Sequence, residues 1–289
     1  MTWRVALRLG RVSNLPTVWT NVLAAAALTG VPVPSVGLVA LAVACSCFYV
    51  GGMFLNDAFD REFDARIRPE RPIPSGAISV GEVFGGGYGL LALGLAVVAV
   101  TSRLVLGAAT PGVVAGLALA GTIVAYDAWH KENPAAPVLM GLCRVLVYVT
   151  TAAALTGRVP LAVIGGGLVL LSYLIGLTYV ARQENLGEVR NMWPLACLAL
   201  PFVAHVGIAF DHGLGAVLYT VTAVWVILAL SHLGWQDRVD VPRTVVSLIA
   251  GIALVDGLAI VAGGHPAATL ACVAAFALTL VLQRWVPGT

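Results

Sequence analysis

The feature that most constrains this chain is a series of ten apolar stretches, each close to the length of a membrane crossing. A spanning helix needs about 20 mostly apolar residues. The chain of 289 residues is 60% hydrophobic and 10% charged, whereas soluble domains average roughly 25% charged residues. This composition excludes a soluble enzyme, a disordered chain and a nucleic-acid-binding protein. The stretches are approximately 15–30, 34–56, 81–101, 105–127, 135–156, 160–181, 192–210, 213–232, 243–262 and 266–285.

We therefore expect an all-α, polytopic bundle of nine to ten transmembrane helices around a central cavity that opens to the cytoplasmic side. No internal repeat, low-complexity segment or linker interrupts the series, so residues 1–289 are expected to form one membrane domain. The first stretch is short and contains Pro16, which leaves its start open.

Charges are distributed unevenly between the loops. If the N-terminal arm lies inside, most of the 16 basic residues fall in inner segments, and Arg103 and Arg158 fall in outer loops. The positive-inside rule then places both termini in the cytoplasm. The acidic residues other than Asp211 and Asp256 share that side. We expect polar chemistry at a cytoplasmic mouth of a protein in the cell membrane.

The connector after the second stretch, residues 56–76, is dense in charge and reads NDAFDREFDARIRPERPIPSG. Asp57, Asp60 and Asp64 are spaced by three and then four residues, so they share one face if the helix continues. Three carboxylates on one face repel each other and need a cation. One interpretation is a solvated helix that pairs with its own arginines. The other is magnesium, which joins one or two carboxylates to substrate phosphates.

The string N-D-x-x-D-x-x-x-D, followed by R-P-x-x-S-G, resembles the first aspartate-rich signature of the UbiA superfamily of intramembrane prenyltransferases. In that family the aspartates hold Mg²⁺ on the diphosphate of an isoprenoid donor. The resemblance implies Mg²⁺-dependent prenyl transfer to a small aromatic, sugar or cyclitol-like acceptor within the bilayer. It implies roles in binding metal and diphosphate for Asn56, Asp57, Asp60 and Asp64, with Arg68 and Arg71 lining the same mouth.

The loop after the fourth stretch, within residues 126–144, contains the chain's only lysine. Lys131 could be an inside-positive anchor, but its place between Tyr126 and Asn133 looks like the family's tyrosine-to-lysine pattern. The resemblance implies that the positive charge of Lys131 binds the diphosphate, with Tyr126 and Asn133 beside it. Asp127 is the candidate base if the acceptor must lose a proton.

Two ionisable residues lie inside apolar stretches. Arg144 lies about two turns into the fifth stretch, and an arginine at a helix centre costs ~2.5–3.5 kcal/mol. Snorkelling is one explanation, and binding of the diphosphate or of a polar acceptor group is the one we favour. For Asp256 in the ninth stretch we expect a hydrogen bond to a nearby serine, threonine or histidine, away from the active site. Asn21 on the first stretch is a candidate acceptor contact.

The loop after the sixth stretch, residues 178–191, departs from the family's second aspartate-rich motif. Ala181 and Asn185 occupy the two aspartate positions. Glu184 and Glu188 are four residues apart and could replace the missing carboxylates, with Glu184 as a metal ligand, or could pair with arginines at a solvated edge. The substrate contacts expected from this loop are Arg182, Glu184, Glu188 and Arg190.

Several functional alternatives stay open. The 126–144 loop and the degenerate second motif look closest to the EboC-like branch of the superfamily, which implies a cyclitol-like or sugar-like acceptor. A secondary transporter also has about ten spans and an intramembrane acid, although the chain shows no clear internal repeat. A terpene cyclase of the same superfamily is the third alternative.

Overall fold

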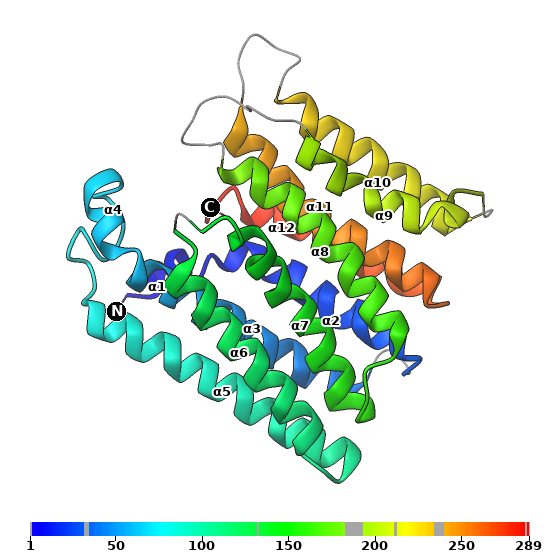
Figure 1. The fold of residues 1–289 in the computed structure, drawn as a ribbon, viewed down its shortest axis with the longest axis horizontal. Helices are drawn as coiled ribbons and strands as arrows, with labels where there is room; N and C mark the ends of the chain where they lie inside the picture. The colour runs from blue at the N-terminus through cyan, green and yellow to red at the C-terminus, as the bar shows by residue number, and fades with distance from the viewer. Residues whose placement is uncertain are drawn as a thin grey trace.

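The computed structural model describes residues 2–31, 35–131, 133–182, 193–210, 213–233, 240–286 and 288. Within these ranges the regular structure is helical and contains no β-strand (Figure 1). The all-α prediction is therefore confirmed for the part of the chain that is described. The elements in chain order are α1 (Trp3–Leu9), η1 (Val12–Asn14), α2 (Leu15–Thr29), α3 (Val36–Phe59), α4 (Arg61–Ile67), α5 (Val80–Leu106), α6 (Thr110–Trp129), α7 (Ala136–Thr156), α8 (Leu161–Arg182), η3 (Trp193–Ala199), α9 (Leu200–Ala204), η4 (Val206–Phe210), α10 (Leu214–Ser231), α11 (Val241–Ala262), η5 (Pro266–Ala268) and α12 (Thr269–Leu282).

Seven of the described helices, α3, α5, α6, α7, α8, α10 and α11, are long and apolar enough to cross a membrane, which makes the chain an integral membrane protein. Three of the ten expected crossings are shorter elements. The stretch 192–210 is broken into η3, α9 and η4, because Pro194 and Pro201 cannot donate to a helix ladder. The helices α2 and α12 have 15 and 14 residues, so each spans only about 20 Å at 1.5 Å per residue.

The helices α2 and α7 lie between two groups of packed helices. One apolar cluster joins them to α3, α5 and α6, and the other joins them to α8, α10 and α11. The late helix α11 is central rather than peripheral, because every residue from Leu248 to Ile260 is buried. Residues late in the chain therefore pack directly against α2, which lies near its beginning.

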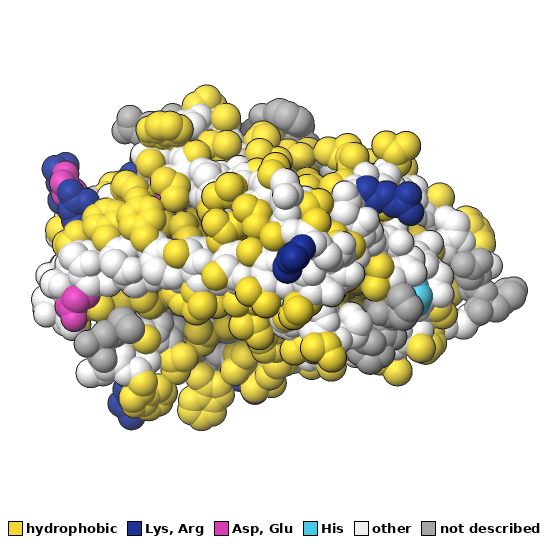
Figure 2. Space-filling model, turned by 90° about the horizontal axis from the view of Figure 1, so that it is seen from below, with side chains coloured by type: hydrophobic (Ala, Val, Ile, Leu, Met, Phe, Trp, Pro, Cys, Tyr) yellow, Lys and Arg dark blue, Asp and Glu magenta, His cyan; other side chains and the backbone are white. Residues whose placement is uncertain are grey.

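The outside of the bundle suits a lipid environment. Large apolar side chains such as Leu93 and Val100 on α5, and Val217 and Ile227 on α10, are exposed. The face in Figure 2 is largely hydrophobic, and the acidic side chains visible on it gather at one end. This separation agrees with the charge asymmetry expected from the sequence.

Glycines let α3 and α5 pack closely beside the segment that carries the aspartates. A Cβ at Gly94 would lie 2.9 Å from the carbonyl oxygen of Ala44, and one at Gly51 would lie 2.9 Å from that of Gly87. Backbone atoms cannot turn away as side chains can. The two helices therefore approach over small residues, as membrane helices commonly do.

We predict opposite effects from two Gly→Ala changes in α5. No atom of another helix lies within 4 Å of a Cβ added at Gly89, so Gly89→Ala should hold or raise Tm, since alanine favours a helix by about 1 kcal/mol. Gly94→Ala should lower Tm, because overpacking costs roughly 1–3 kcal/mol. Thermal unfolding of both variants in detergent tests this, and equal Tm values would contradict the described packing.

Candidate functional site

The three aspartates of the 56–76 segment lie where α3 meets α4. The helix α3 ends at Phe59, Asp60 caps it, and α4 begins at the next residue. The helix therefore does not continue unbroken past the membrane segment. All three carboxylates are buried, and they turn to two different sets of partners.

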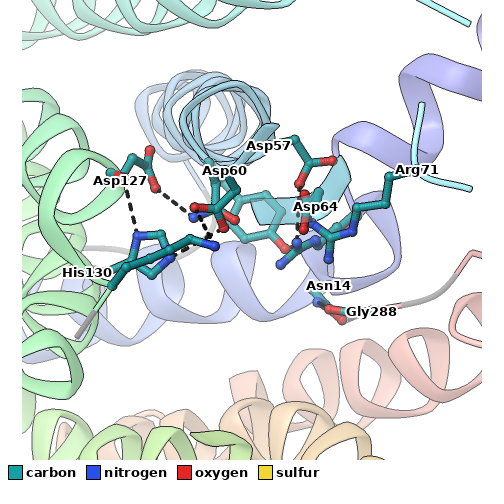
Figure 3. Close-up of polar contacts among 12 residues, drawn as sticks. Asn14, Asp57, Asp60, Asp64, Arg71, Asp127, His130 and Gly288 are labelled. Carbon is teal, nitrogen blue, oxygen red and sulfur yellow. Dashed lines mark hydrogen bonds and ion pairs between the residues drawn. The ribbon is translucent and has the colours of Figure 1, made fainter. Parts of the chain in front are cut away.

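Asp57 and Asp64 converge on one guanidinium (Figure 3). The Nη1 atom of Arg71 lies 3.1 Å from Oδ1 of Asp57 and 2.8 Å from Oδ2 of Asp64. A second arginine, Arg11, places Nη2 3.4 Å from the same Asp57 oxygen. Arg11 has a left-handed backbone with φ of 41°, which turns the chain between α1 and η1. Arg71 was predicted from the charged connector, whereas Arg11 was not.

Asp60 faces the end of α6. Its Oδ1 lies 3.1 Å from Nζ of Lys131, and its Oδ2 lies 3.4 Å from Nε2 of His130. Burial raises the pKa of Asp60, but the hydrogen bonds and charges of His130 and Lys131 outweigh it and leave this pKa below its usual value. Burial lowers the pKa of His130, but the bond to Asp60 outweighs it and raises this pKa. The other ring nitrogen, Nδ1, lies 3.2 Å from the carbonyl oxygen of Asp127 and the ring stacks on Tyr126, so the charged ring is favoured.

His130 was not predicted from the sequence, because it belongs to no ligand-type cluster there. Its neighbour Lys131 was predicted, and the structure brings both to Asp60. The signal available in the sequence was their adjacency in the same short loop.

Asp127 is held at one oxygen and free at the other. Nδ2 of Asn56 donates to its Oδ1 at 3.2 Å. Its Oδ2 is buried and has no hydrogen-bond partner among the described residues. A buried carboxylate oxygen without a partner is costly, so this atom is available to a ligand.

A cavity of about 100 Å³ lies between α2, α3, α6 and α7. Its polar lining includes Tyr126, Asp127 and Arg144. The mouth formed by the aspartates therefore adjoins a mainly apolar chamber. The other lining residues are Val18, Cys45, Phe48, Tyr49, Gly52, Met53, Leu119, Ile123, Met140, Cys143 and Val147.

Arg144 does not snorkel to the surface. Its Nη1 donates to Oδ1 of Asn21 at 2.7 Å, and its Nη2 donates to Oγ1 of Thr17 at 3.1 Å. Asp256 is fully buried and accepts a hydrogen bond from Thr20, as expected, but also from Asn21. Asn21 thereby connects Asp256 to Arg144, which lines the cavity.

The remaining predicted residues lie at the same end of the bundle or outside the described ranges. Arg68 caps α4, and Nη1 of Arg182 donates to the carbonyl of Asn133 at 3.2 Å. This bond joins the end of α8 to the loop that carries Lys131. Glu184, Glu188 and Arg190 lie outside the described residues.

The donor atoms at the mouth fit a magnesium ion. Two carboxylates already converge on one cationic nitrogen of Arg71, in the arrangement that a cation between them requires. In the described parts of the chain, no group of three or more His, Cys, Asp and Glu side chains is arranged to hold a metal ion. Mg²⁺ commonly takes only one or two carboxylates together with waters and substrate phosphates.

The described residues thus form a membrane-embedded helical bundle with a charged mouth beside a mainly apolar cavity. The sequence profile described as the UbiA prenyltransferase family matches residues 14–241, and the chain belongs to this family of enzymes.

Similar proteins agree with this assignment. The chain is 28% identical over 267 residues to digeranylgeranylglyceryl phosphate synthase of Methanopyrus kandleri, covering 88% of this chain and 90% of the relative. The apo structure of a UbiA homolog from Aeropyrum pernix K1 shares the fold, with 18% identity, a TM-score of 0.64 and coverage of 87% and 97%. A UbiA homolog from Archaeoglobus fulgidus bound to GPP and Mg²⁺ has 15% identity, a TM-score of 0.51 and coverage of 96% and 98%.

We predict that Arg71→Gln destabilises the protein strongly when magnesium is removed with EDTA. Loss of one partner of a buried ion pair costs about 3–5 kcal/mol, and here two carboxylates lose their shared cation. Added Mg²⁺ should restore part of the lost Tm. Arg61→Gln is the matched control, because the Arg61–Glu62 pair is exposed and such pairs contribute about 0.2–1 kcal/mol. Equal small losses in both variants would refute the bridging role.

Proposed function

We propose that residues 1–289 act as one Mg²⁺-dependent prenyltransferase domain that moves a prenyl group from an isoprenoid diphosphate to a small hydroxylated acceptor within the membrane. The observation that carries this proposal is the convergence of Asp57 and Asp64 at the mouth of an apolar cavity. The relative solved with GPP and Mg²⁺ supports the choice of donor and metal.

The donor diphosphate is proposed to bind at the mouth. Asp57 and Asp64 would hold Mg²⁺, which when bound draws negative charge from the leaving diphosphate. Asp60, the third ligand predicted from the sequence, would have to leave His130 and Lys131 to join them. The cations already present, Arg71 and Lys131, would neutralise the remaining phosphate oxygens. We propose that His130 and Arg11 assist them, and that Asn56, Arg68, Asn133 and Arg182 line the same end. Glu184, Glu188 and Arg190 stay predictions.

The cavity walls are proposed to take the isoprenoid tail and to keep water from the allylic cation. The allylic C–O bond breaks, and its electron pair leaves with the diphosphate. The acceptor hydroxyl oxygen then bonds to the allylic carbon. Its proton passes to Oδ2 of Asp127, the buried oxygen that Asn56 leaves free.

The acceptor that we favour carries hydroxyl groups. The name of the Methanopyrus kandleri relative gives a product built on glyceryl phosphate, and the EboC-like resemblance implies a cyclitol or a sugar. Both kinds of acceptor present an alcohol to Asp127. An aromatic acceptor is the less favoured candidate.

We further propose ten crossings with both termini and the mouth on the cytoplasmic side. The short elements α2, η3–α9–η4 and α12 would complete the seven longer spans. Support comes from the carbonyl of Gly288, which accepts a hydrogen bond from Nδ2 of Asn14 at 2.9 Å. Asn14 and Gly288 therefore lie together, and an even number of crossings between them would place both on the same side of the membrane.

Asp60→Asn and Asp64→Asn are each expected to lower prenyl transfer by roughly 100-fold or more, the size of effect seen when one stabilising group is removed from an active site. Glu62→Gln on α4 is the matched control and should keep full activity, because the side chain of Glu62 is exposed. Turnover of labelled geranylgeranyl diphosphate in proteoliposomes measures this. Full activity in both aspartate variants would contradict the proposed role of Asp60 and Asp64 in binding the donor.

The same assay separates the alternatives. Diphosphate release that needs an acceptor and gives a prenylated acceptor by mass spectrometry supports the transferase. Release without acceptor together with a cyclised hydrocarbon identifies a cyclase, and solute uptake without covalent product identifies a transporter.

A green fluorescent protein fused to the C-terminus should fluoresce in bacterial cells, since this reporter matures in the cytoplasm, and an alkaline phosphatase fusion should be inactive. Nine crossings would reverse both results.

A further inference from the structure

A chain of hydrogen bonds crosses the middle of the bundle from α11 to the cavity. Oδ2 of Asp256 accepts from Nδ2 of Asn21 at 2.7 Å, and Oδ1 of Asn21 accepts from Nη1 of Arg144 at 2.7 Å. Asp256 and Asn21 have no exposed surface. Arg144 lines the cavity, so one amide connects a buried carboxylate with a guanidinium that a ligand can reach.

The direction of the Asn21 amide follows from the charges at its two ends. Its NH₂ group faces the carboxylate of Asp256, and its oxygen faces the guanidinium of Arg144. The reversed amide would set donor against donor and acceptor against acceptor. Asn21 therefore fits between one anion and one cation in a single orientation.

Both ends of this chain are further restrained. Oδ1 of Asp256 accepts from the hydroxyl of Tyr148 at 2.6 Å, and its Oδ2 also accepts from Thr20 at 2.5 Å. At the other end, Nη2 of Arg144 donates to Thr17 at 3.1 Å. Side chains from α2, α7 and α11 thus leave the guanidinium little freedom.

Stability alone does not explain this network. Buried ion pairs often add nothing compared with apolar side chains of similar volume, and ionisable residues inside a membrane usually serve a function. A guanidinium has five N–H donors. Among the described residues, Arg144 donates hydrogen bonds to Asn21 and Thr17, and its guanidinium carbon lies 5.5 Å from the ring centroid of Tyr49. The other N–H donors are available to a ligand in the cavity.

We propose that Asp256 is a positioning residue that holds Arg144, through Asn21, to bind an anionic group of the prenyl acceptor. The inference rests on the proposed function and adds the acceptor's chemistry, an alcohol that also carries a phosphate or a carboxylate. The diphosphate mouth has its own cations, Arg71 and Lys131, at the ends of other elements. Asp256 lies beyond residues 14–241, the part that matches the family.

The test measures anion binding when the donor site is filled. Purified protein is saturated with Mg²⁺ and geranyl S-thiolodiphosphate, and Tm is followed as inorganic phosphate replaces chloride at constant ionic strength. Phosphate should raise the Tm of the wild type. Arg144→Gln should need roughly tenfold or more phosphate for the same rise, since hydrogen bonds to charged groups are lost. Asp256→Asn and Asn21→Leu should also need more phosphate than the wild type for the same rise in Tm, but less than Arg144→Gln needs.

Two controls separate positioning from stability. Tyr173→Phe removes a buried 2.8 Å hydrogen bond to the carbonyl of Leu248 on the same helix α11, so it should lower the starting Tm but keep the phosphate response. The double variant D256N/R144Q should respond no more weakly than R144Q, because Asp256 acts through Arg144.

The outcomes decide between the proposals. A phosphate response that is absent in the wild type, unchanged in Asp256→Asn, or additively weaker in the double variant overturns the inference. The proposed function is tested separately by the first step, in which the donor analogue should raise the Tm of the wild type but not of Asp64→Asn. Glycerol 3-phosphate and benzoate, used in place of phosphate, then distinguish a phosphate-bearing from a carboxylate-bearing acceptor.

Discussion

A charge inside a membrane protein must find its partner within the same protein, because the hydrocarbon around it offers neither water nor counterions. This requirement shapes both ends of the site. Arg71 lies between Asp57 and Asp64, and Asn21 lies between Asp256 and Arg144. The first set lies within one connector, whereas the second joins helices that are distant in the chain. At Asn21 the packing of the bundle and the geometry of the site therefore depend on the same bonds.

The structure separates two kinds of chemistry along the bundle. Charged groups gather where helices end, around Asp60 and the close of α6, while the cavity below is lined mainly by apolar side chains. An anionic leaving group and an apolar tail need these opposite surroundings within the length of one molecule. The junction of α3 with α4 and the end of α6 meet beside the cavity and supply both surroundings without a separate domain.

The sequence predicted the parts of the site that lie in short contiguous segments. Asp57, Asp60, Asp64 and Arg71 fall within one charged connector, and Lys131 is the only lysine. Arg11 and His130 were missed because their contacts depend on where α1 and α6 end in space. The prolines at 194 and 201 were visible signals that the seventh stretch is not one helix.

The association of Asp256 with Arg144 could have been predicted from the sequence. These two residues carry opposite charges and lie deep in apolar stretches. Because a buried charge in a membrane needs a partner, an interaction between them would have been a reasonable prediction. Asn21 was considered a candidate contact, but its role as the connector depends on α2 lying between α7 and α11. That arrangement follows from packing across 235 residues of chain, which local spacing does not encode.

Residues beyond position 241, where the family match ends, contact the polar side of α2. Gly288 accepts a bond from Asn14, and Nε2 of Gln283 donates to Oδ1 of the same residue at 3.1 Å. Asp256 provides the partner for Thr20 and Asn21 two turns further along. A chain cut at residue 241, where the family match ends, would leave the polar side of α2 facing hydrocarbon. Residues beyond the family match therefore cover the polar side of α2.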